Sequence, residues 1–276
     1  MNHENGKTLI DNAVEKLQAA LEAGQSETLK AYLAAMARFR RYSWGNILLI
    51  ASQCPSATRV CGFKAWQKFG RYVRKGEKGI LILAPMVGKK RTSTDDGQND
   101  EQATVLGFRA AYVWDQTQTD GEPLPQFADV KGDPAEYTER LKALIAERGI
   151  KLEYSDAIAP AKGVSMGGTI RVLPGLPPAS EFSVLVHELS HEALHHQAER
   201  KRQNSKTVME TEAEAVAFVV CEAIGLDNNG SAVDYIALYH GDKAILTELL
   251  AAIQETAAGI LEAILPGASE DAPGQC

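Results

Sequence analysis

The sequence predicts an α+β protein, and three observations carry that prediction. Amphipathic helical runs alternate with short strand-like runs, a turn- and proline-rich stretch follows residue 115, and the two ends of the chain differ in charge. The 276 residues suit two modest domains or one large one, and a hydrophobic content of 45% allows a sizeable core.

In the first half of the chain, the sequence predicts helices followed by strands. Apolar residues recur at helical spacing in 8–23 and 27–39, and a short helix is expected at 62–70. Residues 71–85 predict two strands around a Lys-Gly-Glu-Lys-Gly turn, and 104–115 predict a further strand rich in Val, Phe, Tyr and Trp. The polar stretch 91–103 predicts a flexible loop.

The second half begins after the proline-rich stretch. A helix is expected from residue 134, strands at 150–155 and 168–174, a helix around 187–191, another at 207–224, and packing helices at the C-terminus. This pattern divides the chain into a domain at 1–125, a linker at 126–134 and a domain at 135–276.

Charge separates the two halves as well. Residues 1–91 hold 16 Lys and Arg against 6 Asp and Glu, whereas residues 92–276 hold 13 against 30. A basic front and an acidic rear suggest different partners, with a polyanion for the front. The sequence shows no secretory signal and no apolar run long enough for a membrane helix, and its four scattered cysteines favour a reducing, cytoplasmic compartment.

A His-Glu-x-x-His motif marks the candidate chemical site. His187 and His191 are four residues apart, so a helix places both rings on one face, where they can bind one zinc ion. Glu188 cannot reach the metal in the same way, but its carboxylate can reach a metal-activated water. The simpler alternative is a polar helix that matches by chance, yet the apolar residues before the motif indicate a buried helix whose histidines need partners.

The third ligand is expected on the following helix. The zincin pattern with a third histidine is excluded, because Leu194 stands where that pattern needs Gly and Gln197 where it needs His. Glu210 and Glu214 share a helix face, while Glu212 points elsewhere. Glu210 is favoured as the ligand because Glu214 can then orient a zinc-bound histidine; Glu214 as the ligand is the alternative.

Other polar residues near the motif are expected to have lesser roles. His195 lies too far along the helix to share the ion with His187 and is expected at the surface or in support of a ligand. His196 is expected at the surface. Tyr239 and His240 could donate to an oxyanion, although a place in the core or at the surface is favoured for both.

The predicted chemistry is hydrolysis of a peptide bond. Zinc acidifies a bound water toward a pKa of about 7 and polarises the carbonyl, and Glu188 acts as general base. The strand at 168–174 could offer its edge to an extended peptide.

The basic front combines cations with aromatic residues between 38 and 78, a mixture that suits single-stranded nucleic acid. The alternative is a solvated charged face over core aromatics. The candidate nucleic-acid contacts are Arg38, Arg40, Arg41, Trp44, Lys64, Trp66, Lys68, Arg71, Arg74, Lys75 and Lys78.

These stretches resemble a known family. "YSWGNILLIASQCPSATRVCGFKAWQKFGRYVRKGEKGILILAP" and "VWDQTQTDGEPLP" resemble the N-terminal domain of ArdC-type antirestriction proteins. "HELSHEALHH" with "ETEAEAVAFVV" resembles their zincin-like metallopeptidase domain, which is related to the ImmA/IrrE peptidases. Laid on "ETEAE", the ImmA/IrrE pattern also selects Glu210 and Glu214.

The resemblance implies an α/β domain that binds single-stranded DNA, followed by a gluzincin-type metallopeptidase domain, in a protein that protects incoming DNA from restriction. Zinc, single-stranded DNA and a protein or peptide substrate are the implied cofactor and partners, and no membrane is involved. Two alternatives stay open: a DNA-coating factor with a structural metal site, and an ImmA/IrrE-like peptidase that cleaves a repressor.

Overall fold

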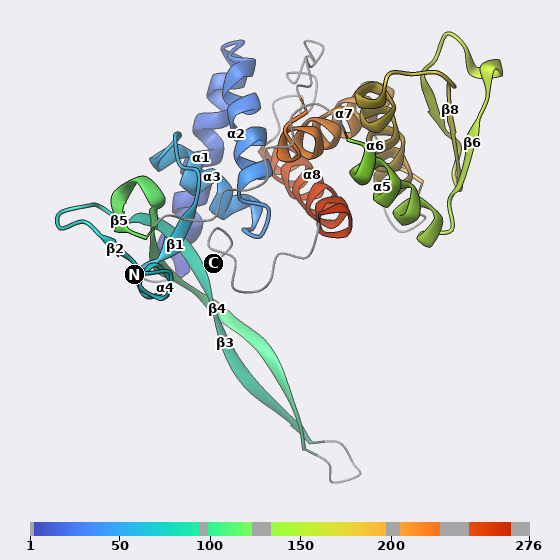
Figure 1. Ribbon diagram of the computed structural model, residues 1–276. Coiled ribbons are helices and arrows are strands. Elements are labelled where there is room, and N and C mark those ends of the chain that lie inside the picture. Colours follow the sequence, from blue (N-terminus) through green and yellow to red (C-terminus); the bar gives the residue numbers. More distant parts are fainter. Residues whose placement is uncertain (1–2, 94–98, 123–133, 197–204, 227–242, 266–276) are drawn as a thin grey trace.

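The computed structural model describes residues 3–93, 99–122, 134–196, 205–226 and 243–265 (Figure 1). Helices and strands both occur in each half, which confirms the α+β class. The N-terminal half consists of α1 (His3–Glu22), α2 (Ser26–Arg38), α3 (Trp44–Gln53), β1 (Val60–Gly62), α4 (Phe63–Lys68), β2 (Arg71–Val73), β3 (Ile80–Ser93), β4 (Asn99–Asp115), the 3-10 turn η1 (Gln116–Gln118) and β5 (Thr119–Gly121).

The strands of this half form two antiparallel sheets, in the orders β1-β4-β3 and β2-β5. Strands β3 and β4 continue beyond the body as a long two-stranded arm (Figure 1). The loop predicted at 91–103 is therefore wrong at both ends, because β3 runs to Ser93 and β4 begins at Asn99. Of the predicted loop, residues 91–93 and 99–103 are strand.

Alternation along the strands fixes which face of the first sheet is buried. Ile80, Ile82 and Val113 point to one side, where they join the hydrophobic core beside α1 and α3. The outer edge of β3 is covered by side chains of α3. The Asn46 amide exchanges two hydrogen bonds with the Leu83 main chain, at 2.8 and 2.9 Å, and the Gln53 amide does the same with Leu81.

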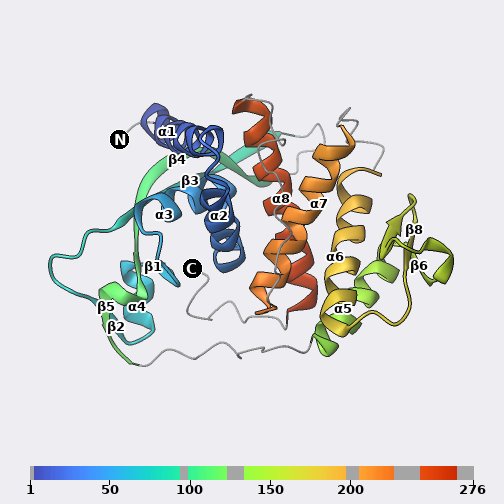
Figure 2. The same cartoon turned by 90° about the horizontal axis from the view of Figure 1, so that it is seen from above.

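The second half packs a small mixed sheet against helices α5 (Ala135–Glu147) and α6 (Pro178–Leu194) (Figures 1 and 2). Its other elements are β6 (Lys151–Tyr154), the turn η2 (Asp156–Ile158), β7 (Gly163–Ser165), β8 (Thr169–Val172), α7 (Lys206–Ala223) and α8 (Lys243–Ile264). The sheet order is β6-β8-β7, with β8 parallel to β6 and antiparallel to β7. Because β8 is paired on both sides, the prediction that it offers an edge to a peptide is wrong.

Helices from both halves pack side by side. Figures 1 and 2 show α7 and α8 between α2 on one side and α5 and α6 on the other, and α2 contacts α7 directly. The buried apolar residues form one continuous core across both halves. The predicted domain bounds stay a prediction, and the linker at 126–134 lies outside the described residues except for Pro134.

Helix α8 is long and apolar enough to pass a composition test for a membrane span. Its apolar face is nevertheless buried in the protein, with Leu246, Leu250, Ile253, Ile260 and Ile264 in the core. The described residues therefore give α8 the character of a core helix rather than a membrane helix.

Candidate metal centre

The helix that carries the motif is anchored by its own sequence. Pro178 occupies the first turn of α6, where a missing N–H costs nothing. Phe182, Leu185 and Leu189 are completely buried along one side of the helix. Glu181 lies in the first turn, accepts from the Tyr154 hydroxyl at 2.5 Å and pairs with Lys142 at 3.1 Å, so it fastens α6 to β6 and α5.

Helix α7 lies against α6 and brings the predicted carboxylates to the two histidines. Its N-terminus is capped by Ser205, whose hydroxyl accepts from the Val208 N–H. The Nε2 atoms of His187 and His191 lie 3.1 Å apart. Glu210 Oε2 is 3.4 Å from the first and 3.5 Å from the second. The three predicted ligands thus converge on one point.

The spacing of these donors fits a single metal ion. Ligands held at 2.0–2.1 Å around a tetrahedral ion are separated from one another by about 3.3 Å. Two imidazole nitrogens and a carboxylate oxygen within 3.1–3.5 Å of one another would repel unless a proton or a cation lay among them. Two imidazoles and one carboxylate are a donor set suited to a divalent transition metal.

Glu214 lies where its helix spacing predicts. Its Oε2 is 3.3 Å from His187 Nδ1, one turn along α7 from Glu210. An Nδ1–H donated to this carboxylate leaves the Nε2 lone pair directed at the centre. Burial disfavours charge on His187, but the hydrogen bond that its ring donates to Glu214 and the nearby carboxylates outweigh burial and raise its pKa. For His191, burial and the neighbouring His187 lower the pKa.

Glu188 is buried, with 7% of its surface exposed, and its carboxyl is close enough to His187 and Glu210 to sense their charges. Burial is the main cause that raises the pKa of its carboxyl to about 7. The Ser165 main-chain N–H donates to this carboxyl and opposes that rise. A Cβ placed on Gly163 would stand 2.5 Å from Glu188 Oε1, so β7 approaches the glutamate as closely as glycine permits.

Glu192 is a contact residue that the sequence reasoning missed. Its buried carboxylate accepts from the Ser165 hydroxyl at 2.7 Å and from the N–H groups of Gly167 and Gly168 at 2.9 and 2.7 Å. Ser165 is therefore held twice by α6, through its N–H to Glu188 and through its hydroxyl to Glu192. The available signal was the i, i+4 spacing of the two glutamates on a buried helix.

His195 has its side chain buried beside the predicted ligand His191 rather than at the surface, and a supporting role for it stays a prediction. Only 6% of its side chain is exposed, and its ring lies against that of His191 with centroids 5.3 Å apart. Its Nε2 is 3.2 Å from the Met209 carbonyl and 3.7 Å from Glu212, which confirms that Glu212 points away from the metal donors. Burial and the neighbouring His191 lower the pKa of His195 to about 4. His196 is exposed as expected, and Tyr239 and His240 lie outside the described residues.

Of the two tryptophans among the predicted nucleic-acid contacts, Trp66 is a core residue and Trp44 is partly buried. Trp66 is completely buried and donates its indole N–H to the Trp114 carbonyl at 2.9 Å, so the prediction that it contacts nucleic acid is wrong. Trp44 is half-buried and packs against the core. Both rings follow the general preference of large aromatics for the interior, which outweighed the basic surroundings in the sequence.

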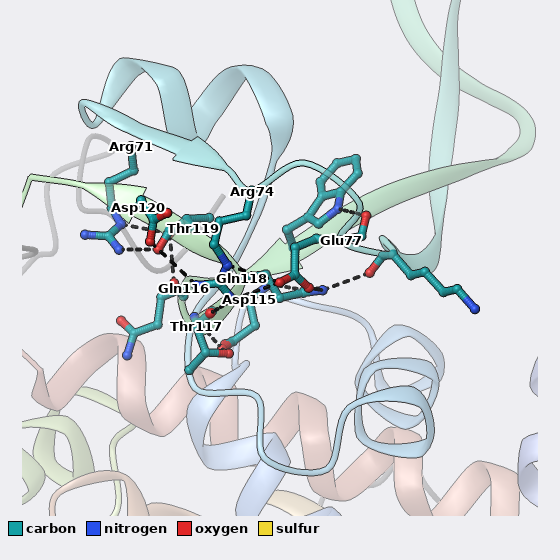
Figure 3. Close-up of polar contacts among 11 residues, drawn as sticks. Arg71, Arg74, Glu77, Asp115, Gln116, Thr117, Gln118, Thr119 and Asp120 are labelled. Atoms are coloured by element: carbon teal, nitrogen blue, oxygen red, sulfur yellow. Dashed lines mark hydrogen bonds and ion pairs between the residues drawn. The ribbon is translucent and has the colours of Figure 1, made fainter.

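Two of the predicted arginines hold the fold together (Figure 3). The Arg71 guanidinium donates to the hydroxyl and carbonyl of Thr119 and to the Glu122 carbonyl. The Arg74 guanidinium pairs with Glu77 at 2.8 Å and donates to the Thr117 carbonyl at 2.7 Å. These cations tie β2 and the following turn to η1 and β5, which makes them structural.

The remaining basic candidates are placed mostly at the surface. The exposed ones are Arg38, Arg41, Lys64, Lys68, Lys75 and Lys78. Arg40 is half-buried, and burial followed by the charge of Arg41 lowers its pKa. These cations come from several elements and do not approach the metal donors, so any role in nucleic-acid binding belongs to a separate surface.

Comparisons with known proteins agree with this arrangement. Residues 5–114 match the family described as the N-terminal domain of anti-restriction factor ArdC. The solved structure of antirestriction ArdC protein from R388 plasmid, metal-free, aligns with a TM-score of 0.56 at 19% identity over 92% of this chain and 97% of that one. Its Mn(II)-bound structure also gives 0.56, at 20% identity over 94% and 99%.

A relative of unknown function is similar in sequence. An uncharacterized Bacillus anthracis protein, pXO2-81, is 26% identical over 83% of this chain. The chain spans 46% of the length of that relative.

The fold and the site therefore define an α+β protein in which an ArdC N-terminal domain precedes a helical unit with a candidate metal centre. Residues 5–114 match the ArdC N-terminal domain family, and the fold of the chain is similar to that of the R388 ArdC protein.

Proposed function

We propose that the chain is an antirestriction protein that binds single-stranded DNA and hydrolyses a peptide bond at a metal centre held by His187, His191 and Glu210. The 3.1–3.5 Å spacing of these three donors beside the buried Glu188 carries the proposal. The likeness of residues 5–114 to the ArdC N-terminal domain supports the antirestriction role. The free thiols of Cys54, Cys61 and Cys221 agree with a cytoplasmic setting.

The proposed reaction assigns each residue a task. Zinc, or another divalent ion, supplies a Lewis acid when bound. Glu188 accepts a proton from the attacking water on its carboxylate and returns it to the nitrogen of the leaving amine. A carboxyl whose pKa is about 7 suits both transfers near neutral pH. Glu214 holds the His187 ring in the orientation that keeps Nε2 directed inward.

Strand β7 is the better candidate for holding an extended peptide. Lys162 and Met166 bond to β8, so the main-chain groups of Gly163 and Ser165 point away from that strand. Among the described strands, β7 ends the sheet on this side, and it lies directly beside Glu188. A peptide added along β7 would bring its carbonyl next to the proposed base.

The test separates proteolysis from DNA binding. Glu188→Gln keeps the size of the side chain and removes the base, while the exposed Glu222→Gln on α7 is the matched control. Unmodified DNA is transferred into a restricting host, and survival is measured with wild type and both variants. We expect Glu188→Gln to lose protection while its metal affinity and its DNA affinity stay at the wild-type level.

Equal protection by wild type and Glu188→Gln would reject the peptidase part of the proposal. That result would favour a DNA-coating factor whose metal site is structural. A wild-type protein without affinity for single-stranded DNA would reject the DNA-binding part independently.

A further inference from the structure

Strand β4 has its aromatic side chains on the exposed face. Alternation places Phe108, Tyr112 and Trp114 on one side of the strand and Val113 on the other. Val113 is buried in the core, whereas 42% of Phe108 and 53% of Tyr112 is exposed. The strand therefore buries Val113 and leaves Phe108 and Tyr112 at the surface.

Neighbouring elements extend this surface. Leu81 lies opposite Tyr112 on β3, and both share the outer side of the sheet. The Phe63 ring, at the start of α4, meets the Trp114 ring edge-on with centroids 5.9 Å apart, and 46% of Phe63 is exposed. We call these five side chains the aromatic face: Phe63, Leu81, Phe108, Tyr112 and Trp114.

The aromatic face is unusual because large apolar side chains gather there in the open. Single exposed apolar residues are common, but a contiguous patch on one sheet face marks a binding surface. In the part of the chain that the structure describes, helices α1 and α3 pack on the opposite side of this sheet.

The charges beside the aromatic face are positive. Lys64 follows Phe63, and Lys78 precedes Gly79, whose Cα lies against the Tyr112 and Trp114 side chains; both lysines are exposed. The carboxylates nearby are already paired. Glu77 binds Arg74 and Gln118.

Asp115, at the end of β4, is also fully engaged. It is completely buried and accepts from the main chain of Thr58, Arg59 and Thr117. Exposed cations next to stackable rings, with the neighbouring carboxylates Glu77 and Asp115 engaged within the chain, complement a polyanion that has unpaired bases.

We propose that the aromatic face is the surface on which unpaired bases of single-stranded DNA stack, with Lys64 and Lys78 contacting the phosphates. The inference rests on the proposed DNA binding and gives it a location and a mode. The sequence pattern predicted DNA contacts on the helices and on Trp66. The proposed stacking surface lies instead on the outer side of β4. Stacking makes the interaction tolerant of base sequence, because every base has a ring face.

The test measures binding of fluorescein-labelled (dT)20 to the full chain by fluorescence anisotropy. The variants are Tyr112→Ala and Phe108→Ala, and the control is Tyr72→Ala, which removes a tyrosine that is 60% exposed on β2. Each aromatic lost from the face should weaken binding about five- to hundredfold with the salt dependence kept. Lys64→Gln and Lys78→Gln should instead each lower the salt slope by about one.

A rescue variant distinguishes loss of base stacking from loss of the folded structure. Tyr112→Trp should restore the affinity that Tyr112→Ala loses, because the replacement keeps a ring for stacking. As a readout free of any folding change, titration of the wild-type chain with (dT)20 should quench its tryptophan fluorescence, and Trp114→Phe should remove most of that quenching.

Wild-type affinity in Tyr112→Ala and Phe108→Ala would overturn this inference and leave the proposed DNA binding intact. Absence of binding by the wild type would overturn both. A wild-type dimer that becomes monomeric in Tyr112→Ala with unchanged DNA affinity would assign the face to a second copy of the chain instead.

Discussion

The α6–α7 pair and the outer side of β4 depart from the usual distribution of polar and apolar residues in opposite directions. On these two helices, ionisable side chains such as Glu188, Glu192 and Glu212 are buried. On β4, large rings such as Phe108 and Tyr112 are exposed. Each departure costs folding free energy, because buried charge loses hydration and exposed apolar surface forgoes burial.

The two regions offset this loss of folding free energy in different ways. The buried carboxylates receive hydrogen bonds and histidine partners within the chain, so the metal centre is largely built before any ion arrives. The rings of Phe108 and Tyr112 are largely exposed, and a partner that covered them would bury this apolar surface. The first region should therefore respond to substitution in both metal affinity and stability, and the second in binding alone.

The largest effect is expected from removing a donor. His191→Ala should lower the affinity for Zn²⁺ or Mn²⁺ by about a thousandfold, since one of three converging donors is lost. Competition with a chromophoric chelator measures the change. His196→Ala, an exposed histidine just beyond the same helix, should keep wild-type affinity. Equal losses in both variants would contradict the assigned site.

A smaller effect on the same affinity is expected at the supporting carboxylate. Glu214→Gln should lower metal affinity by about ten- to a hundredfold, because His187 loses the acceptor that orients its ring. The same titration checks this, with the exposed Glu222→Gln on α7 as control. If Glu214→Gln removed binding as completely as His191→Ala, Glu214 would be a ligand in its own right.

The packing of β7 on α6 gives the third prediction. In Gly163→Ala the new Cβ would stand 2.5 Å from Glu188 Oε1 and 2.6 Å from a Val184 methyl, so the strand must shift. The free energy of unfolding should fall by about 1–3 kcal/mol. Urea denaturation measures it beside Gly62→Ala, where a Cβ meets open space. Equal stability in the two variants would show that β7 is free to move.

The smallest effect is expected at the N-terminus of α6 and depends on pH. Burial alone would raise the pKa of Glu181, but hydrogen bonds from Tyr154 and Lys142 outweigh it and lower the pKa. The charged carboxylate therefore stabilises the fold fully above its unfolded pKa, and the contribution is lost as pH falls through the lower folded value. Glu181→Gln should cost about 1 kcal/mol at pH 7.

Urea denaturation at several pH values measures this difference. The gap between wild type and Glu181→Gln should close as pH drops below the ordinary carboxyl range near 4. A gap that stayed constant down to pH 3 would show that packing rather than charge holds Glu181 in place.

The two regions also differ in how far the sequence could predict them. Local spacing sufficed at the metal centre, because His187 with His191 and Glu210 with Glu214 each share a helix face by i, i+4. Only the meeting of α6 and α7 had to be assumed. The role of Glu192 escaped notice because its partner, the short strand β7, lacks the length and alternation that would mark a strand.

On the N-terminal side, composition indicated a charged and aromatic surface. It could not show which of these side chains are exposed and which are buried or bonded within the fold. Trp66 looks like an exposed ring in a basic stretch, and only the tertiary contact with Trp114 buries it. Arg71 and Arg74 carry charge in the sequence but bond to main-chain carbonyls far along the chain. The period-two spacing of Phe108, Tyr112 and Trp114 was readable, although which side of the strand faces solvent depends on the helices beneath.

The amide side chains on α3 affect whether copies of this chain associate at high concentration. An open strand edge beside exposed rings would invite a second ribbon to pair with it and start a growing aggregate. Asn46 and Gln53 occupy the main-chain groups of Leu83 and Leu81 on that edge, so a helix stands in for the missing strand. The chain can thereby keep its rings exposed for a partner, while the β3 edge at Leu81 and Leu83 is closed to copies of itself.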